Sequence, residues 1–156
     1  MKKPKLVLVG NGMAGIRALE ELLKLAPDLY DITVFGAEPH GNYNRILLSP
    51  VLSGELKLAE IMLNDLDWYA KNQIVLRAGR KIVRIDRARR RVVAEDGTEE
   101  PYDRLLLATG STPFMLPIPG SDLPGVLAYR DIADTETMIE AAARYRRAVV
   151  IGGGLL

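Results

Sequence analysis

The chain has 156 residues, about the size of one domain, and is 48% hydrophobic and 26% charged. This composition excludes disordered, collagen-like and low-complexity chains. The 21 basic and 20 acidic residues leave a net charge of +1, so no bulk field favours a nucleic acid or an anionic membrane. With no cysteine and one histidine, these residues form no disulfide, thiolate metal site, cysteine nucleophile or histidine metal cluster.

No apolar stretch of the sequence is long enough for a membrane helix or a signal peptide. Spanning a bilayer takes about 20 apolar residues. The apolar run at 6–9 stops at Gly10 and Asn11, short of the hydrophobic region of a signal peptide. We therefore expect a cytoplasmic protein that binds neither membranes nor nucleic acids.

The chain opens with the pattern of a strand, a glycine-rich turn and a helix. Residues 6–9 are a short apolar run typical of a strand buried on both faces. The sequence GNGMAG follows at 10–15, and apolar residues then recur at helical spacing until Pro27. Residues 31–35 predict a second strand, with Glu38 just beyond it. The beginning of the chain is therefore expected to be a βαβ unit.

The middle of the chain predicts shorter elements. Residues 39–54 are irregular or briefly helical, 65–72 predict a short helix, and 74–76 resume a strand. The partly alternating segments 81–85 and 91–94 flank a turn and predict a small antiparallel β-meander.

The last third of the chain combines a strand, a linker, a helix and a final strand. Residues 105–110 predict a buried strand that runs into a glycine turn, and four prolines within 113–124 mark a linker. Residues 134–145 predict a helix with one apolar face, and the run 148–151 predicts another buried strand.

The glycines at 10, 12 and 15 each have a physical reason in a dinucleotide-binding turn. Gly10 permits the tight turn, Gly12 lets the backbone approach a pyrophosphate, and Gly15 lets the helix pack closely on the strand. The pyrophosphate would lie on free N–H groups at the helix N-terminus, where the macrodipole favours anions. Glu38, 23 residues after Gly15, is placed to accept hydrogen bonds from the adenosine ribose.

Glu38 also predicts which dinucleotide binds. A carboxylate repels a 2′-phosphate, so the site is expected to take FAD or NAD rather than NADP. The alternative interpretation is purely structural: the glycines make a tight turn, and Glu38 is a solvated surface acid.

The C-terminal sequence repeats the start of this pattern. Gly152-Gly153-Gly154 follows the apolar run 148–151, and the last glycine of a second fingerprint would fall one position beyond Leu156. We therefore expect a fragment of a longer protein with two nucleotide sites, in which Gly152 and Gly154 belong to the second. A flexible glycine tail is the alternative.

Four segments carry a resemblance to a known family: GNGMAG at 10–15, EPHGNYNRILLSPVLSGE at 38–55, YDRLLLATGSTPF at 102–114 and VVIGGGLL at 149–156. Over essentially its whole length the chain resembles the N-terminal flavoprotein part of NAD(P)H-dependent assimilatory nitrite reductase large subunits. These belong to the wider family of FAD-dependent pyridine-nucleotide reductases, in which an inserted NAD domain interrupts an FAD domain.

The resemblance implies roles for individual residues. The glycine turn and Glu38 would bind the ADP half of FAD, Arg45 would lie near the flavin, and the turn at 108–110 would contact FAD. It implies no metal ligand in this chain and no general acid or base. The expected cofactor-binding residues are Gly10, Asn11, Gly12, Met13, Ala14, Gly15, Glu38, Arg45, Ala108, Thr109, Gly110, Gly152 and Gly154.

One departure from the wider family is informative. Many of its members carry a lysine after the serine of a PPLSK stretch, close to the flavin, whereas here Pro50 follows Ser49. Proline cannot make the charged contact of that lysine. The difference weakens the likeness to ferredoxin and rubredoxin reductases and favours the nitrite reductase branch.

Other candidate sites have simpler explanations. Seven basic residues between Arg80 and Arg91 suggest a nucleic-acid patch, but a solvated hairpin fits their partial alternation better. His40 has no acid and hydroxyl arrangement that would make it a base. Trp68 and Tyr69 are expected to be core aromatics rather than residues that stack on a flavin.

The prediction is an α/β, Rossmann-like FAD/NAD(P)-binding fold of three layers, with a parallel sheet and a small antiparallel β-meander. Residues 1–115 would be the first segment of an FAD domain, and 116–156 a linker and the incomplete start of an NAD(P) domain. In the parent protein, electrons would pass from NAD(P)H through FAD to a sirohaem and iron–sulfur module. That module, which lies outside these residues, would reduce nitrite. The alternatives are a ferredoxin- or rubredoxin-type reductase and a non-catalytic nucleotide-binding module.

Two expectations concern the chain on its own. The resemblance places the segments that complete the FAD domain after the NAD domain, so the isolated chain is expected to bind FAD weakly or not at all and to show no reductase turnover. The strand predicted at 148–151 would be unpaired, which favours self-association. The sequence leaves open the terminal acceptor and the choice between NADH and NADPH.

Overall fold

The computed structural model describes residues 3–153 and divides into two compact units. The first unit holds the chain up to Asn44 together with Ala59–Ser111, and the second holds Arg45–Leu58 together with the chain from Thr112. Each unit is described by itself. The predicted division at residue 115 concerns cofactor domains, and it stays a prediction.

A four-stranded parallel sheet forms the centre of the first unit. Its strands lie in the order β5 (Val75–Arg77), β2 (Asp31–Phe35), β1 (Lys5–Val9) and β9 (Arg104–Leu107). Because β1 is paired on both sides and covered on both faces, its residues from Leu6 to Val9 are buried, as the continuous apolar run predicts.

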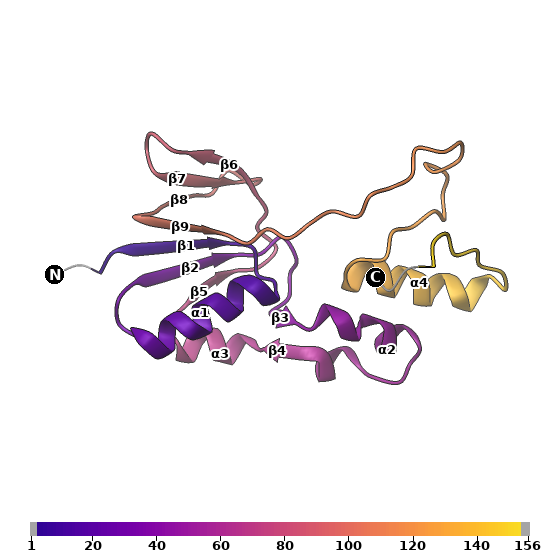
Figure 1. The fold of residues 1–156 in the computed structure, drawn as a ribbon, viewed down its shortest axis with the longest axis horizontal. Coiled ribbons are helices and arrows are strands. Elements are labelled where there is room, and N and C mark those ends of the chain that lie inside the picture. The colour runs from indigo at the N-terminus through magenta and orange to yellow at the C-terminus, as the bar shows by residue number, and fades with distance from the viewer. Residues whose placement is uncertain (1–2, 154–156) are drawn as a thin grey trace. The chain divides into compact units, whose positions relative to one another are not determined.

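Two helices cover one face of this sheet. Helix α1 (Met13–Leu25) and helix α3 (Leu66–Lys71) both lie on the side opposite the β-meander (Figure 1). Leu8 and Leu19 are fully buried there, and each contributes roughly 1.5–3 kcal/mol of apolar burial. The buried cluster consists of Leu6, Leu8, Ile16, Leu19, Ile32, Val34, Tyr69 and Ile74.

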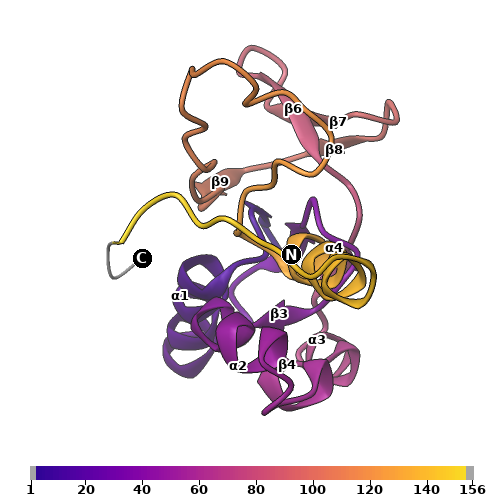
Figure 2. The same ribbon diagram turned by 90° about the vertical axis from the view of Figure 1, so that its right-hand side faces the viewer.

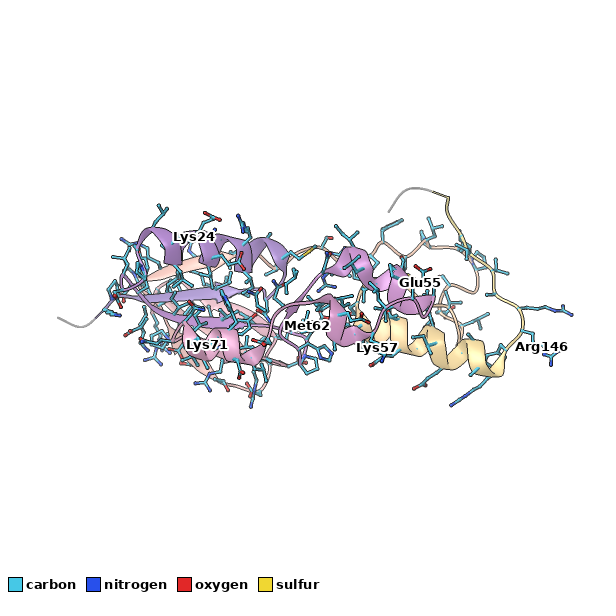
Figure 3. All side chains as sticks on the ribbon, turned by 90° about the horizontal axis from the view of Figure 1, so that it is seen from below. Lys24, Glu55, Lys57, Met62, Lys71 and Arg146 are labelled. Atoms are coloured by element: carbon cyan, nitrogen blue, oxygen red, sulfur yellow. The ribbon has the colours of Figure 1, made fainter. Side chains whose placement is uncertain are left out.

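The sequence explains the C-terminus of α1 and the N-terminus of α3. In α1 the cap residue Ala26 leaves the helical region because Pro27 follows it. In α3 the Asp65 carboxylate accepts a hydrogen bond from the Trp68 N–H and caps the N-terminus. The last turns carry Lys24 and Lys71, which Figure 3 labels at the ends of α1 and α3 and which complement the helix dipoles.

A three-stranded antiparallel meander covers the other face of the sheet. It consists of β6 (Ile82–Asp86), β7 (Arg91–Ala94) and β8 (Glu99–Pro101), and Figure 2 shows it on the side of the sheet away from α1 and α3. The second buried cluster joins the meander to the sheet through Val7, Val9, Phe35, Val92 and Ala94. The predicted three-layer α/β fold with a meander is therefore confirmed.

The predicted strand that begins near residue 105 is present as β9, but its predicted burial is only partial. Strand β9 is at the edge of the sheet and, within the described residues, pairs with β1 alone. Leu107 is 55% exposed. An apolar run identifies the strand, but only long-range pairing decides whether that strand is central or at an edge.

A small two-stranded ribbon was not anticipated from the sequence. Strands β3 (Asn42–Tyr43) and β4 (Met62–Asn64) pair antiparallel, and Figure 3 labels Met62. The 3₁₀ helix η2 (Leu58–Ile61) precedes β4. Strands of two and three residues are too short to show alternation, so their pairing depends on residues far apart in sequence.

The second unit contains the 3₁₀ helix η1 (Arg45–Leu47), helix α2 (Leu48–Leu52) and helix α4 (Ile132–Arg144). Helices α2 and α4 contact each other. Asp131 and Asp134 form a reciprocal capping box at the start of α4. The predicted helix at 134–145 is confirmed, and this cap explains why it begins two residues earlier.

The strand predicted at 148–151 is wrong. These residues form no strand, and the Val149 side chain is 88% exposed. The reason is that an apolar run forms a strand only when a neighbour supplies hydrogen bonds, and among residues 3–153 this run has none. Self-association through residues 148–151 remains a prediction. Gly154 lies outside the described residues.

The described residues carry no long apolar helix and no cluster of metal ligands. Between residues 3 and 153, no helix has the length and apolar character to cross a bilayer. The same part of the chain holds no group of three or more His, Cys, Asp or Glu residues placed to bind a metal ion.

Candidate dinucleotide-binding site

Gly10 makes the turn after β1, and only glycine fits there. Its φ is +113°, a backbone conformation that L side chains rarely adopt. A Cβ at this position would lie 2.0 Å from the carbonyl oxygen of Ala108. The Gly10 N–H donates a 2.8 Å hydrogen bond to the Phe35 carbonyl, which ties the turn to the end of β2.

Gly15 brings helix α1 close to the ends of the strands. A Cβ on Gly15 would lie 2.8 Å from the carbonyl oxygen of Gly10, 3.0 Å from the Ala108 Cβ and 3.1 Å from a Leu8 methyl. Any side chain here would push the helix away from the sheet. The predicted packing roles of Gly10 and Gly15 therefore match their geometry.

Gly12 has the opposite environment. It is the N-cap of α1, with extended backbone angles, and a Cβ would meet no atom within 4 Å. The first N–H groups of the helix, those of Met13, Ala14 and Gly15, have no intrahelical acceptor, and no acidic residue lies in the first turn. This helix end therefore presents N–H donors and positive dipole potential beside space that glycine keeps open, which favours an anion.

The side chain of Asn11 is engaged within the protein. Its Nδ2 donates a 3.1 Å hydrogen bond to the His40 carbonyl, and its Oδ1 accepts one of 2.7 Å from the Tyr69 hydroxyl. The same hydroxyl accepts a 3.2 Å bond from the Asn42 N–H. The side chain of Asn11 thus braces the turn, and its role as a cofactor-binding residue remains a prediction.

Tyr69 contacts the glycine turn, whereas its sequence context predicts only a core aromatic residue. Its side chain is 2% exposed, and its ring packs edge-on against Trp68 with centroids 5.1 Å apart. Burial raises the pKa of Tyr69 to about 12, although the hydrogen bonds with Asn42 and Asn11 lower it in part. No local pattern in the sequence indicates that this hydroxyl reaches a turn 58 residues away.

Glu38 lies at the end of β2, beside the glycine turn. Between them, a Cβ on Gly36 would come 2.9 Å from the Asn11 Cβ, so the two loops are in close contact. The Glu38 carbonyl accepts a 2.9 Å hydrogen bond from Gly79, and its Oε2 accepts one of 2.6 Å from the Tyr43 hydroxyl. The predicted ribose acid and the predicted phosphate turn are therefore brought together.

The turn after β9 borders the same place. Ala108 donates a 2.8 Å hydrogen bond to the Val9 carbonyl, and its own carbonyl lies against Gly10. Gly110 has a φ of +73°, which turns the chain away from the sheet. Ala108 and Thr109 thus lie against the first turn, and their predicted contact with FAD remains a prediction.

Arg45 and Gly152 belong to the second unit. The Arg45 side chain donates a 2.9 Å hydrogen bond to the carbonyl of Arg130. Gly152 has a φ of +117°, and a Cβ there would meet nothing within 4 Å. Their assignment to a cofactor site remains a prediction.

The basic hairpin carries acidic partners. Arg80 pairs with Asp96, Arg91 pairs with Glu99, and Asp86 lies between two further arginines. Such surface ion pairs are typical of a solvated hairpin, and the expectation that no nucleic acid binds remains a prediction.

A parallel sheet whose first strand enters a glycine turn and a helix N-terminus, with an acid at the end of the second strand, defines the dinucleotide-binding class of α/β proteins. Residues 4–156 match the pyridine nucleotide-disulphide oxidoreductase family. The chain belongs to this family.

Curated relatives agree with this assignment. Over all 156 residues the chain is 56% identical to a nitrite reductase [NAD(P)H] and 50% identical to the assimilatory nitrate reductase electron transfer subunit, both of Bacillus subtilis. It covers 19% and 20% of these proteins, so it spans about a fifth of their length. Over 97% of the chain it is 36% identical to a ferredoxin–NAD(+) reductase component of the biphenyl dioxygenase system of Paraburkholderia xenovorans, of which it covers 37%.

Solved structures have the same fold. The putidaredoxin reductase complex with putidaredoxin matches 90% of the chain with a TM-score of 0.77 and 28% sequence identity, and the match covers 34% of that structure's chain. The resemblance to nitrite reductases and to the wider reductase family is therefore confirmed.

Proposed function

We propose that this chain is the FAD-binding part of a flavoprotein oxidoreductase that passes electrons from NAD(P)H to a downstream acceptor. The observation that carries the proposal is the contrast among three glycines. Side chains are excluded at Gly10 and Gly15 by packing, whereas Gly12 faces open space at the N-terminus of α1. Glycine at a position without steric need is explained by the close approach of a ligand.

The residues of the first unit fit the ADP half of FAD. The N–H groups of Met13 and Ala14 would hold the pyrophosphate, and the carboxylate of Glu38 would accept hydrogen bonds from the ribose hydroxyls. Ala108, Thr109 and Gly110 would line the same cofactor where the chain leaves the sheet. When bound, the flavin supplies the redox chemistry, so these residues bind and orient it and need no acid–base role.

The acceptor is proposed from the relatives. The names of the two Bacillus subtilis proteins support a role in nitrite or nitrate reduction, with sirohaem and an iron–sulfur cluster in modules outside these residues. Because the chain has no cysteine, no cysteine-ligated cluster can lie within it. A cytoplasmic location remains a prediction.

Two other functions belong to the same fold. One is a ferredoxin- or rubredoxin-type reductase, supported by the likeness to the ferredoxin–NAD(+) reductase component. The presence of Pro50 where many such enzymes have lysine favours the nitrite reductase branch. The other is a nucleotide-binding module without redox activity. Such a module would bind ADP but would make no contacts that hold the isoalloxazine ring of a flavin.

The test is a titration of the full chain with FAD and with ADP. Flavin fluorescence monitors FAD binding, and calorimetry monitors the binding of both ligands. Saturable ADP binding supports the proposal, because these residues would hold the ADP half of FAD. FAD binding that ADP displaces, even at low affinity, distinguishes the flavoprotein from the non-catalytic module. Failure to bind ADP contradicts the proposal. Since the chain spans about a fifth of its reductase relatives, we also propose that it shows no NADH oxidation by itself. Robust turnover by the 156 residues would contradict that part.

A further inference from the structure

We propose that Tyr43 is a positioning residue for the ribose acid, and that it sharpens the preference for ribose over 2′-phosphorylated ribose. The inference rests on the proposed dinucleotide function. Its basis is the 2.6 Å hydrogen bond that the Tyr43 hydroxyl donates to Oε2 of Glu38. A bond this short to a carboxylate is charge-assisted and is among the stronger kinds of hydrogen bond.

The donor is held rigidly. Tyr43 is 5% exposed and lies on β3, where it pairs with Met62 of β4. The next residue, Asn44, donates a 2.8 Å hydrogen bond to the Ile61 carbonyl. With its ring buried and its backbone paired, Tyr43 cannot follow a moving carboxylate, so it fixes where the Glu38 oxygen lies.

The backbone of Glu38 is anchored as well. Its carbonyl accepts a hydrogen bond from Gly79, and the carbonyl of Gly36 accepts one of 2.7 Å from Arg80. What remains mobile in a glutamate is its side chain, and ordering that side chain on binding costs entropy. A partner that orders it before the ligand arrives removes this cost from the binding step.

The chemistry of the partner matters for specificity. A carboxylate has about four acceptor positions, so one donor from Tyr43 is compatible with further donors from a ribose diol. A tyrosine hydroxyl is neutral, and it orders the carboxylate without cancelling its charge. The negative charge that repels a 2′-phosphate is therefore kept, and it is held in one place.

The test compares two probes on the full chain: ADP-ribose and 2′-phospho-ADP-ribose, titrated by calorimetry. We expect Tyr43→Phe to weaken ADP-ribose binding roughly tenfold and to change the 2′-phosphorylated probe much less, so that discrimination falls. In a Glu38→Gln background the same substitution should leave discrimination unchanged. Tyr102→Phe, which alters a partly buried ring of the same unit, is the matched control and should behave as wild type.

The outcomes separate this inference from the proposed function. If the wild type binds neither ADP-ribose nor FAD, the proposed function fails and the inference fails with it. If the wild type binds and discriminates, but Tyr43→Phe weakens both probes equally or neither, only the inference is overturned. Should Tyr43→Phe fail to fold, Glu38→Asp keeps the charge and shortens its reach. Loss of discrimination in Glu38→Asp supports positioning, and full discrimination overturns it.

Discussion

The Tyr69 hydroxyl donates a 2.7 Å hydrogen bond to the side-chain oxygen of Asn11, which joins α3 to the turn that follows β1. The other end of the Asn11 amide donates to the His40 carbonyl. The glycine turn is therefore braced by the Tyr69 side chain and the His40 backbone carbonyl, which belong to two segments distant in sequence. In the proposed site Gly12 presents bare backbone to a ligand, and this bracing gives the turn a rigidity that its glycines cannot supply.

Tyr69→Phe should lower the free energy of unfolding of the first unit and should also make the glycine turn at 10–15 less rigid. Removing the hydroxyl leaves the partly buried Asn11 oxygen without that donor, at a cost of about 1 kcal/mol in the free energy of unfolding. Urea unfolding would measure this loss, with Tyr102→Phe as the control. An unfolding midpoint equal to that of the wild type would show that the bond is not needed.

The same tyrosine predicts how stability depends on alkaline pH. The pKa of Tyr69 is raised from 10.0 to about 12 by burial, so the unfolded chain loses this proton at a lower pH than the folded chain. The stabilisation is fully present below pH about 10 and is lost as the pH rises toward about 12. The slope is at most about 1.4 kcal/mol per pH unit.

Urea titrations at several pH values in this window would measure the slope. Tyr69→Phe removes the titrating group and should flatten the curve by the same amount. An identical alkaline slope in the wild type and the variant would contradict the assignment to Tyr69.

The sequence predicts those parts of the fold that local patterns encode. The βαβ opening and the meander follow from apolar periodicity and turn residues, and the distinct roles of Gly10 and Gly15 follow from steric demands of the turn. The pairing of β3 with β4 and the edge position of β9 depend on contacts between distant segments, which no local pattern contains. The predicted strand at 148–151 failed for the same reason, because an apolar run does not specify its neighbours.

The site shows the same division. The backbone features, a glycine turn and an acid at the end of the second strand, were predicted because spacing along one βαβ unit determines them. The side-chain contacts of Asn11 and Glu38 were not, because Tyr69 and Tyr43 reach them from other elements. These tyrosines were visible in the sequence only as aromatic residues.

Gly12 and Gly10 should respond to substitution in opposite ways. Gly12→Val places its side chain in open space with an allowed φ of −86°, so the fold should lose no more than about 1 kcal/mol from the poorer N-cap while binding of FAD or ADP is lost. Gly10→Ala forces a Cβ against the Ala108 carbonyl at a φ of +113°, and overpacking of this kind costs roughly 1–3 kcal/mol or more.

Unfolding curves and calorimetric titrations of both variants separate the two effects. Comparable stability of Gly12→Val and the wild type, with ADP binding abolished, would match the expectation. Unimpaired ADP binding by folded Gly12→Val would mean that the open space at Gly12 does not receive the ligand.

The capping box of α4 gives an independent prediction for the second unit. The Asp131 side chain accepts a 2.9 Å hydrogen bond from the Asp134 N–H, and Asp131→Ala should lower the free energy of unfolding by about 1 kcal/mol. Asp122→Ala, at an exposed loop position of the same unit, removes the same charge without a cap and should change stability far less. Circular dichroism of both variants during thermal unfolding would measure the difference. Equal melting temperatures for the two variants would show that this cap does not stabilise α4, because the loss of one charge would then explain the change in both variants.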